Sequence, residues 1–335
     1  MSKTIIPEEY FSMLSLYETQ EAIGTIKSIF EKKLSMALRL KRVSAPVVID
    51  PLTGLNDDLN GVERPVSFDV PALQKDAQVV HSLAKWKRMA LYRYDFHVGK
   101  GLLADMNAIR RDEELDNTHS IYVDQWDWEK IIRKEDRNLD YLKETVRRIV
   151  NVICNTLDEV KYHFESLRTE LCRDVTFITS SELAALYPDR TPKEREDLFA
   201  KEHKTIFIMQ IGDVMENGER HDGRAPDYDD WALNGDLLFW DEVLGHALEI
   251  SSMGIRVDEK SLDEQLNKAG CNERRELPFH KMLLEGKLPL TIGGGIGQSR
   301  LCMLMLGKAH IGEVQSSVWD QETMEICRSA GVELL

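Results

Sequence analysis

The sequence is poor in cysteine, and the few cysteines it has lie far apart. There are five, and no two of them form a Cys-x-x-Cys pair. An odd number without such spacing argues against a disulfide framework and against a zinc site built from thiolates. We therefore expect reduced, mostly buried thiols at Cys154, Cys172, Cys271, Cys302 and Cys327.

Long apolar runs are also missing. No stretch approaches the roughly 20 apolar residues that a membrane-spanning helix needs. The first residues, MSKTIIPEEYF, lack the apolar stretch of a secretory signal peptide. The sequence therefore predicts a cytoplasmic protein that does not associate with a membrane.

Positive charge is in deficit. The chain has 43 lysines and arginines against 58 aspartates and glutamates, which gives a formal net charge of -15. Non-specific binding to nucleic acid depends on neutralising phosphates with basic side chains, so this balance argues against a nucleic-acid partner. A small molecule is the expected partner instead.

Repeats, low-complexity segments and linkers rich in proline, glycine or serine are absent as well. Nothing in the sequence marks a domain boundary, and 42% apolar residues are ample for a core. The simplest prediction is a single domain over residues 1–335.

What the sequence does contain is clear periodicity. Apolar residues recur every three or four positions from Ile23 to Ala37 and from Leu142 to Val160, so each stretch predicts a long amphipathic helix. The run KRVSAPVVID predicts a strand at a sheet edge or an interface, because Pro46 has no N–H to donate. The runs SIYVDQW, KTIFIMQIG, DLLFW and ALEISS predict further strands. The last two are too close for a helical crossover, so we expect an α+β fold with a mainly antiparallel sheet flanked by helices.

A glycine run stands near the C-terminal end, in TIGGGIGQSRLCMLML (291–306). It lacks the lysine of a P-loop, and Arg300 takes the place of the third glycine of a dinucleotide-binding fingerprint. What remains is Gly-x-Gly-x-x-Arg, formed by Gly295, Gly297 and Arg300, before an apolar run that predicts a helix. Free backbone N–H groups, a helix N-terminus and a fixed guanidinium suit a polyphosphate. On this motif alone, a tight turn with a surface arginine is the alternative.

Charged residues cluster in five short stretches, each of which could by itself be a solvated face or a loop. They are GLNDDLNG (Asp57, Asp58), HSLAKWKR (Lys85, Lys87), AIRRDEE (Arg110, Asp112, Glu113), YVDQWDWE (Asp124, Gln125, Asp127) and RAPDYDDW (Asp227, Asp229, Asp230). In a strand over YVDQWDWE, alternation puts Gln125 and Asp127 on one face. A sheet face with these polar groups is a poor core and a good binding surface.

The polar, glycine-bearing segment that contains RAPDYDDW, residues 217–236, has the composition of an ordered functional loop. If NGDLLFW and ALEISSMGIR form a hairpin, Asp236 and Glu249 can approach each other. Their oxygens are the hard ligands that Mg²⁺ accepts while it also bridges phosphates. Two exposed carboxylates at strand edges are the alternative. As Mg²⁺ ligands, the two carboxylates together with the arginines and the glycine run suggest nucleoside-triphosphate chemistry.

Five blocks of the sequence resemble the ammonia-dependent asparagine synthetases, the aspartate–ammonia ligase family. They are VVHSLAKWKR, YVDQWDWE, RAPDYDDW, EISSMGIR and TIGGGIGQSR, and the resemblance runs in order from near Thr19 to the C-terminal GVELL. That family is similar to the catalytic core of class II aminoacyl-tRNA synthetases, especially those for aspartate and asparagine. The resemblance thus implies a single catalytic domain with a class II synthetase-like core.

The resemblance assigns an ATP site. Gly-x-Gly-x-x-Arg would be the third motif of the class, with Arg300 on the ATP phosphates and over the adenine. AIRRDEE would be the second motif, with Arg110 on the α-phosphate. The implied ATP-binding residues are Arg110, Glu113, His119, Asp236, Glu249, Gly295, Gly297 and Arg300, and Asp236 and Glu249 would also hold Mg²⁺.

The resemblance also assigns an aspartate site, where each charge of the substrate needs an opposite partner. Lys87 suits the α-carboxylate, and Asp57, Asp127 or Asp229 suits the ammonium group. The implied aspartate-binding residues are Asp57, Ser82, Lys87, Gln125, Asp127, Asp229, Ser251, Ser252 and Arg256.

The implied reaction has two steps. Aspartate and ATP form β-aspartyl adenylate and pyrophosphate, and ammonia then releases asparagine and AMP. Arg110 and Arg300 would act in the first step, and Asp57 or Asp229 would accept the proton that ammonium must lose. The helix and strand over residues 19–50 would be the dimerisation motif, so a homodimer is implied.

Three alternatives agree less well with the sequence. A tRNA-charging relative would need a tRNA-binding appendage, for which no residues remain. A non-catalytic module that binds amino acid or nucleotide is expected to lose some of Arg110, Asp236, Glu249 and Arg300, and all four are present. Use of glutamine as nitrogen donor needs a glutaminase domain and a cysteine at position 2.

The chain also departs from the family pattern at one place. The resemblance implies an additional stretch between DYDDW and LNGD, whereas Ala232 alone separates Trp231 from Leu233 here. We expect a shortened loop near the substrate pocket, which puts lid closure and ammonia retention in doubt more than the fold.

Overall fold

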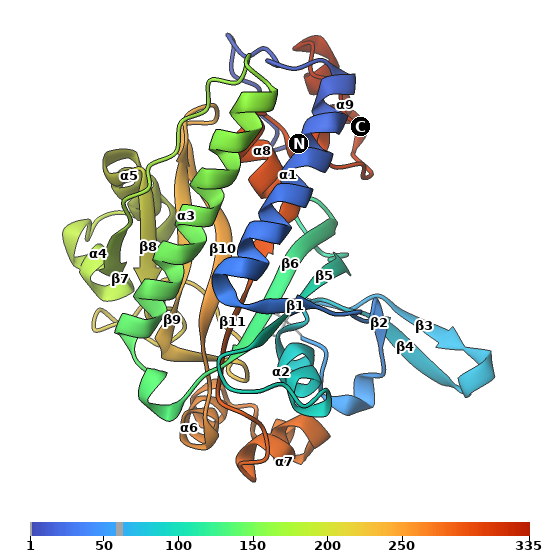
Figure 1. The fold of residues 1–335 in the computed structure, drawn as a ribbon, viewed down its shortest axis with the longest axis vertical. Helices are drawn as coiled ribbons and strands as arrows, with labels where there is room; N and C mark the ends of the chain where they lie inside the picture. The colour runs from blue at the N-terminus through green and yellow to red at the C-terminus, as the bar shows by residue number, and fades with distance from the viewer. Residues whose placement is uncertain (1, 58–62) are drawn as a thin grey trace.

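The computed structural model describes residues 2–57 and 63–335, so Asp58 lies outside the described part. An eight-stranded sheet with the order β1-β5-β6-β11-β10-β9-β8-β7 forms its centre (Figure 1). The strands are β1 (Leu40–Arg42), β5 (Gly101–Ile109), β6 (Tyr122–Ile131), β7 (Thr176–Thr179), β8 (Thr205–Met209), β9 (Asp229–Asp241), β10 (His246–Arg256) and β11 (Thr291–Gly297).

Neighbouring strands from β5 to β8 run antiparallel, and only the edge pairs β1–β5 and β7–β8 are parallel. This confirms the predicted mainly antiparallel sheet. The predicted hairpin is also confirmed, as β9 and β10 pair from Asp241 and His246 onward.

The two predicted long helices cover one face of the sheet. They are α1 (Leu16–Leu38) and α3 (Leu139–His163), and they lie side by side across the strands (Figure 1). A capping box between Ser15 and Glu18 starts α1 before the first residue of its apolar pattern. Phe30 of α1 packs against Trp126 of β6 with ring centroids 4.6 Å apart. With this face filled by core side chains, the opposite face is left for a site.

Seven further α-helices surround the sheet in the described part of the chain. They are α2 (Ala84–Arg93), α4 (Ser180–Leu186), α5 (Pro192–His203), α6 (Glu259–Ala269), α7 (Pro278–Leu284), α8 (Gln298–Leu306) and α9 (Gln321–Ser329). The apolar run after the glycine run forms α8, as predicted, and it is buried beside α1. Within the described residues, we find no helix with both the length and the apolar character needed to cross a bilayer.

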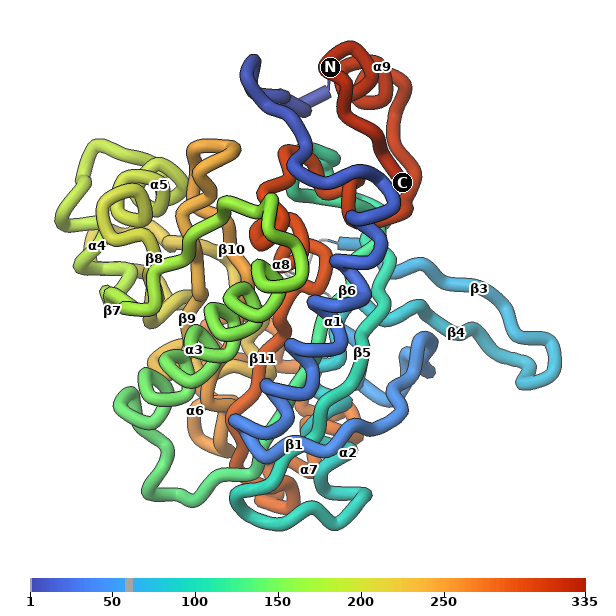
Figure 2. The backbone as a smooth tube through the Cα atoms, turned by 45° about the horizontal axis from the view of Figure 1, so that its top comes forward, coloured from blue at the N-terminus to red at the C-terminus, as the bar shows by residue number. Residues whose placement is uncertain are grey.

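A second, three-stranded sheet has the order β2-β4-β3. Its strands are β2 (Val48–Ile49), β3 (Ser67–Val70) and β4 (Lys75–Val79), and the β3–β4 hairpin projects from the body of the molecule (Figures 1 and 2). The single strand expected over KRVSAPVVID is therefore wrong, because the run divides into β1 and β2. Pro46 lies between them and cannot donate to either ladder, although β1 does form a sheet edge as expected.

The shortened loop expected at Trp231–Leu233 is not a loop, because these residues lie inside β9. Pairing with β10 is irregular here, between Gly254 and Arg256. The Gln265 side chain of α6 bridges the irregularity by accepting a hydrogen bond from the Trp231 N–H at 2.9 Å. The strand therefore continues without the extra stretch.

Candidate active site

A cavity of about 420 Å³ lies on the side of the sheet away from α1 and α3, a volume typical of small-molecule sites. Most of the predicted site residues meet in its wall. They are Asp57, Ser82, Lys87, Arg110, Glu113, His119, Gln125, Asp127, Asp229, Glu249, Ser252, Arg256, Gly295, Gly297 and Arg300. Ser251 and Asp236 are the two predicted residues that the described wall does not include.

The floor of the cavity comes from alternation along β6. Trp126 and Trp128 belong to the core cluster that contains α1 and α3 side chains. Gln125 and Asp127 point the other way and line the cavity, as the sequence predicted. Glu129 follows them on this face and is fully buried.

The glycine run forms the adjacent strand β11, and its glycines have negative φ or extended backbone. Close approach, and not a turn, requires them. A Cβ on Gly295 would overlap the Gln125 amide oxygen, and one on Gly293 would overlap the Glu129 carboxylate. The absence of side chains at these glycines of β11 thus lets β6 side chains reach across the strand.

Helix α2 presents Lys87 to this floor. Its Nζ donates to the Asp127 carboxylate and, at 2.9 Å, to the Gly294 carbonyl. The side chain is 1% exposed, and burial lowers the pKa of Lys87 although Asp127 opposes the change. Lys85 anchors the same helix by donating to the buried Asp227 at 3.1 Å. Lys85 and Asp227, both from the charged stretches, therefore support the structure.

Arg256 stands beside Lys87 at the end of β10. Its Nη1 donates to the Asp229 carboxylate, and its Nη2 donates to the Glu129 carboxylate at 2.8 Å. Burial alone would lower the pKa of Arg256, but Asp229 and Glu129 outweigh burial and raise it. Thr291 donates to Glu129 at 2.6 Å and fixes that carboxylate. This end of the cavity therefore contains two lysine or arginine cations and several carboxylates, all nearly dry.

Asp57 and Ser82 complete this end from outside the large sheet. The His81 ring contacts the Asp57 carbonyl oxygen at 3.1 Å, which ties the two segments together. The Ser82 hydroxyl accepts from the Ala84 N–H at 3.0 Å and so helps to start α2. Both residues line the cavity, as predicted.

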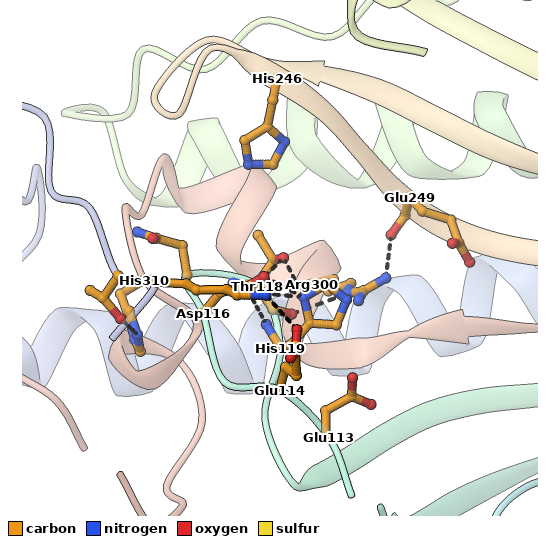
Figure 3. Close-up of polar contacts among 12 residues, drawn as sticks. Glu113, Glu114, Asp116, Thr118, His119, His246, Glu249, Arg300 and His310 are labelled. Carbon is orange, nitrogen blue, oxygen red and sulfur yellow. Dashed lines mark hydrogen bonds and ion pairs between the residues drawn. The ribbon is translucent and has the colours of Figure 1, made fainter. Parts of the chain in front are cut away.

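Arg300 marks the other end of the cavity, and Figure 3 shows it beside Thr118, His119 and Glu249. Its Nε donates to the Thr118 carbonyl at 3.3 Å and its Nη1 to the Glu249 carbonyl at 3.2 Å. The Asp116 carboxylate holds the neighbouring His119 ring at 2.9 Å. These contacts fix the arginine between α8, β10 and the loop before β6.

The loop between β5 and β6 carries Arg110 and Glu113 into the same end. Their side chains lie 3.8 Å apart, and both remain partly exposed. Arg256 and Glu249 are seven residues apart along β10. At the rise of a strand, this separation is about 20 Å. The cavity therefore has one end of paired charges and a separate end of arginines.

Asp236 and Glu249 are not directly opposite each other, because β9–β10 pairing places Asp236 against Ser252 and Glu249 against Leu238. The guanidinium of Arg224 is close to both carboxylates. It donates to Asp236, and the charges of Asp236 and Glu249 raise the pKa of Arg224 against the effect of burial.

Two carboxylates suit Mg²⁺ only if another molecule supplies further oxygens. Across residues 2–57 and 63–335, no group of three or more His, Cys, Asp and Glu side chains could hold a metal ion. The buried Asp236 Oδ1 makes no hydrogen bond of normal geometry among the described residues, although the Ser252 side chain is close to this carboxylate, so Oδ1 can accept a further contact. The pair therefore fits a metal ion that arrives with phosphates.

Some residues in and beside the cavity were not among the predicted site residues. Arg224 and Tyr228 line the cavity and Glu129 orients Arg256, although all three stand within or beside stretches already singled out. Asp230 in RAPDYDDW pairs instead with Arg137 at 2.6 Å. Strand alternation along β9 would have separated Asp229 from Asp230.

Comparison with known sequences gives the family. The profile described as aspartate-ammonia ligase matches residues 17–331. A Clostridium tetani aspartate–ammonia ligase is 60% identical over 334 residues, 99% of this chain and 98% of that protein. One from Clostridium perfringens is 59% identical over the full length of both chains, and one from Lactobacillus johnsonii is 59% identical over 99% of each.

Solved structures with low sequence identity share the fold. An Entamoeba histolytica asparaginyl-tRNA synthetase in complex with asparaginyl-adenylate gives a TM-score of 0.65 at 14% identity, over 90% of this chain and 66% of that one. The Pyrococcus horikoshii enzyme complexed with asparaginyl-adenylate gives 0.62 at 16% identity, over 94% and 74%. The class II synthetase-like core expected from the sequence is thus confirmed. By sequence, fold and matched length, the chain belongs to the aspartate–ammonia ligase family.

Proposed function

We propose that this protein makes asparagine from aspartate and ammonia through a β-aspartyl adenylate, with release of pyrophosphate and AMP. Family membership carries the overall reaction. One observation supports the adenylate route, namely a single cavity with charge-paired groups at one end and arginines at the other. An amino acid and a nucleotide can then meet in the middle, over β11.

The charge-paired end is proposed to bind aspartate. Lys87 is suited to the α-carboxylate, with Arg256 as the neighbouring cation, while Asp57, Asp127 and Asp229 are candidates for the ammonium group. Lys87 is already paired with Asp127, and Arg256 with Asp229. A zwitterion entering between these pairs exchanges one set of ion pairs for another and leaves no buried charge alone.

The arginine end is proposed to bind ATP. Arg110 and Arg300 are suited to the phosphates, and Glu113 and His119 to the rest of the nucleotide. Asp236 and Glu249 would hold Mg²⁺, which neutralises phosphate charge as pyrophosphate departs. Fixed guanidinium groups favour the transition state in the same way, because they need no reorganisation as charge develops.

The proposed reaction has two steps. A β-carboxylate oxygen of aspartate forms a bond to the α-phosphorus as the bond to pyrophosphate breaks. The ammonia nitrogen then bonds to the activated carbonyl carbon and gives up a further proton to solvent, and AMP leaves with the former carboxylate oxygen. Ammonium must first give up one proton, and Asp57 and Asp229 are the candidates to accept it. Burial raises the pKa of Asp229 while Arg256 opposes the shift.

The nucleotide product tests this route. With ATP, Mg²⁺, aspartate and ammonium, we expect AMP and asparagine in equal amounts, measured by chromatography. Omission of ammonium should stop asparagine formation, and added tRNA should change nothing. Formation of ADP and phosphate would instead indicate an acyl-phosphate route and contradict the proposal.

We also propose a homodimer built on residues 19–50. Large apolar side chains in this region are exposed, including Met36 (73%), Val47 (52%) and Val48 (45%). A two-fold contact would bury the same surface on both chains. We expect a dimer in light scattering at micromolar concentration and its dissociation in Val48→Glu. Leu186→Glu, at an exposed position of α4 (57%), is the control, and a monomeric wild type refutes the proposal.

A further inference from the structure

Arg224 pairs with a carboxylate that the proposed function reserves for a metal ion. It lies in the segment between β8 and β9, lines the cavity, and donates from Nη2 to Asp236. Asp236 is only 6% exposed and lies outside the described cavity wall. The guanidinium therefore stands between Asp236 and the cavity.

The pair is incompletely satisfied on both sides. Arg224 Nε and Asp236 Oδ1 are both buried, and neither makes a hydrogen bond of normal geometry in the part of the chain that the structure describes, although the Ser252 side chain is near enough to Asp236 to act on its pKa. Buried polar atoms are normally paired, and an exception calls for a cause such as a missing ligand. Each partner thus has capacity for another molecule, an anion for Arg224 and a cation for Asp236.

Several contacts hold the segment that carries Arg224. The His221 ring contacts Glu196 of α5 at 3.1 Å. Arg220 lies over the Trp231 ring at 5.8 Å from its centroid. Nη1 of Arg224 itself donates to the Gly223 carbonyl at 3.2 Å and to Asp222 at 3.3 Å. The backbone that carries Arg224 is therefore held by local structure, and in this state its guanidinium rests on Asp222 and Asp236.

We infer that Arg224 is an internal cation that occupies the place of the metal on Asp236 until the metal–nucleotide complex binds. This inference rests on the proposed function of Asp236 and Glu249 as the metal site. A divalent cation alone must displace a guanidinium and finds only two suitable carboxylates among the residues that the structure describes. A cation that arrives with ATP brings phosphate oxygens, which both complete its coordination and accept the displaced Arg224. Metal and nucleotide thus enter as a unit.

The test is a titration of nucleotide-free enzyme with Mn²⁺, in which free Mn²⁺ is measured by electron paramagnetic resonance. Arg224→Gln makes Asp236 available, so its Mn²⁺ dissociation constant should be at least about tenfold lower than that of the wild type. Arg220→Gln changes an arginine of the same segment that does not contact Asp236, and it should bind as the wild type does. The double variant Arg224→Gln/Asp236→Asn should lose the gain.

Unchanged or weaker Mn²⁺ binding by folded Arg224→Gln overturns the inference, as does a gain that survives Asp236→Asn. If Arg224→Gln does not fold, Mn²⁺ binding by the Asp236→Asn variant tests the inference instead. Its nucleotide-free Mn²⁺ binding should equal that of the wild type, because Arg224 already blocks the carboxylate, and weaker binding overturns the inference. The proposed function is tested separately, by whether wild-type enzyme with Mg²⁺ and ATP forms asparagine and AMP.

Discussion

Replacement of Arg300 by alanine is expected to slow adenylate formation by about a thousandfold, in line with the loss of a fixed donor or arginine at a phosphoryl-transfer site. Arg300 lines the cavity, and within the described residues its side chain makes two hydrogen bonds, both to backbone carbonyls. Its removal leaves no buried charge alone, so the fold should persist. Pyrophosphate release that depends on aspartate is the measurement, with thermal unfolding as the check on structure.

Two further variants make the Arg300 result specific. Arg300→Lys keeps the charge but loses the planar fork, and it should recover only part of the rate. Arg148→Ala removes an exposed arginine of α3 that pairs with Glu144, and it should behave as wild type. Near-normal pyrophosphate release by Arg300→Ala would mean that the glycine run and its arginine serve only the structure.

The parts of the fold that follow a regular period could be predicted from the sequence. The helices α1 and α3 followed from apolar spacing, and β6 from alternation that also placed Gln125 and Asp127 correctly. The glycine run could not be recognised as a strand, because glycine has low strand propensity. The need for glycine there comes from Gln125 and Glu129, which reach across from the neighbouring strand.

Ser251 and Ser252 show a second limit. Glu249 lines the cavity, and simple alternation would put Ser251 on the same face. A bulge between Glu249 and Ser251 shifts the register by one residue, so Ser252 lines the cavity while the Ser251 hydroxyl donates to the Gly295 carbonyl at 2.8 Å. The sequence carries no local sign of that bulge.

Arg224 shows a third limit. It lies in a segment without periodicity, and its partner Asp236 is twelve residues away on β9. The sequence marked the segment as functional from its composition alone. Which of its side chains enters the cavity depends on contacts with α5 and Trp231 that only the folded chain makes.

Lys87→Met is expected to raise the aspartate KM by about 30- to 5000-fold, which corresponds to the roughly 2–5 kcal/mol lost when one partner of a buried charge pair is removed. Methionine keeps the length of the side chain but cannot donate to Asp127, to the Gly294 carbonyl or to a substrate carboxylate. ATP affinity should change little, because the arginine end of the cavity lies several residues away along β10 and β11. Initial rates at varied aspartate and varied ATP separate the two effects.

Two control variants distinguish loss of aspartate binding from structural disruption of the cavity. Lys87→Met/Asp127→Asn removes the buried carboxylate that the single variant leaves unpaired, and it should restore stability without restoring aspartate affinity. Asp236→Asn should give the opposite kinetic pattern, with weaker use of Mg²⁺ and ATP and a nearly normal aspartate KM, because it acts at the metal end. Equal loss of both affinities in Lys87→Met and Asp236→Asn would show that the cavity is not divided in this way.

The same division explains why aspartate should be preferred over glutamate. With the α-carboxylate fixed near Lys87 and the ammonium by an acidic partner, side-chain length decides whether the second carboxylate reaches the α-phosphorus. Glutamate is one methylene longer, and in a buried, charge-paired site its misplacement leaves charges unpaired. The discrimination should therefore exceed the roughly 1–3 kcal/mol that one methylene gives in an apolar pocket. In Lys87→Met this preference should fall together with aspartate affinity, and a preference that survives the substitution would place the selection elsewhere in the cavity.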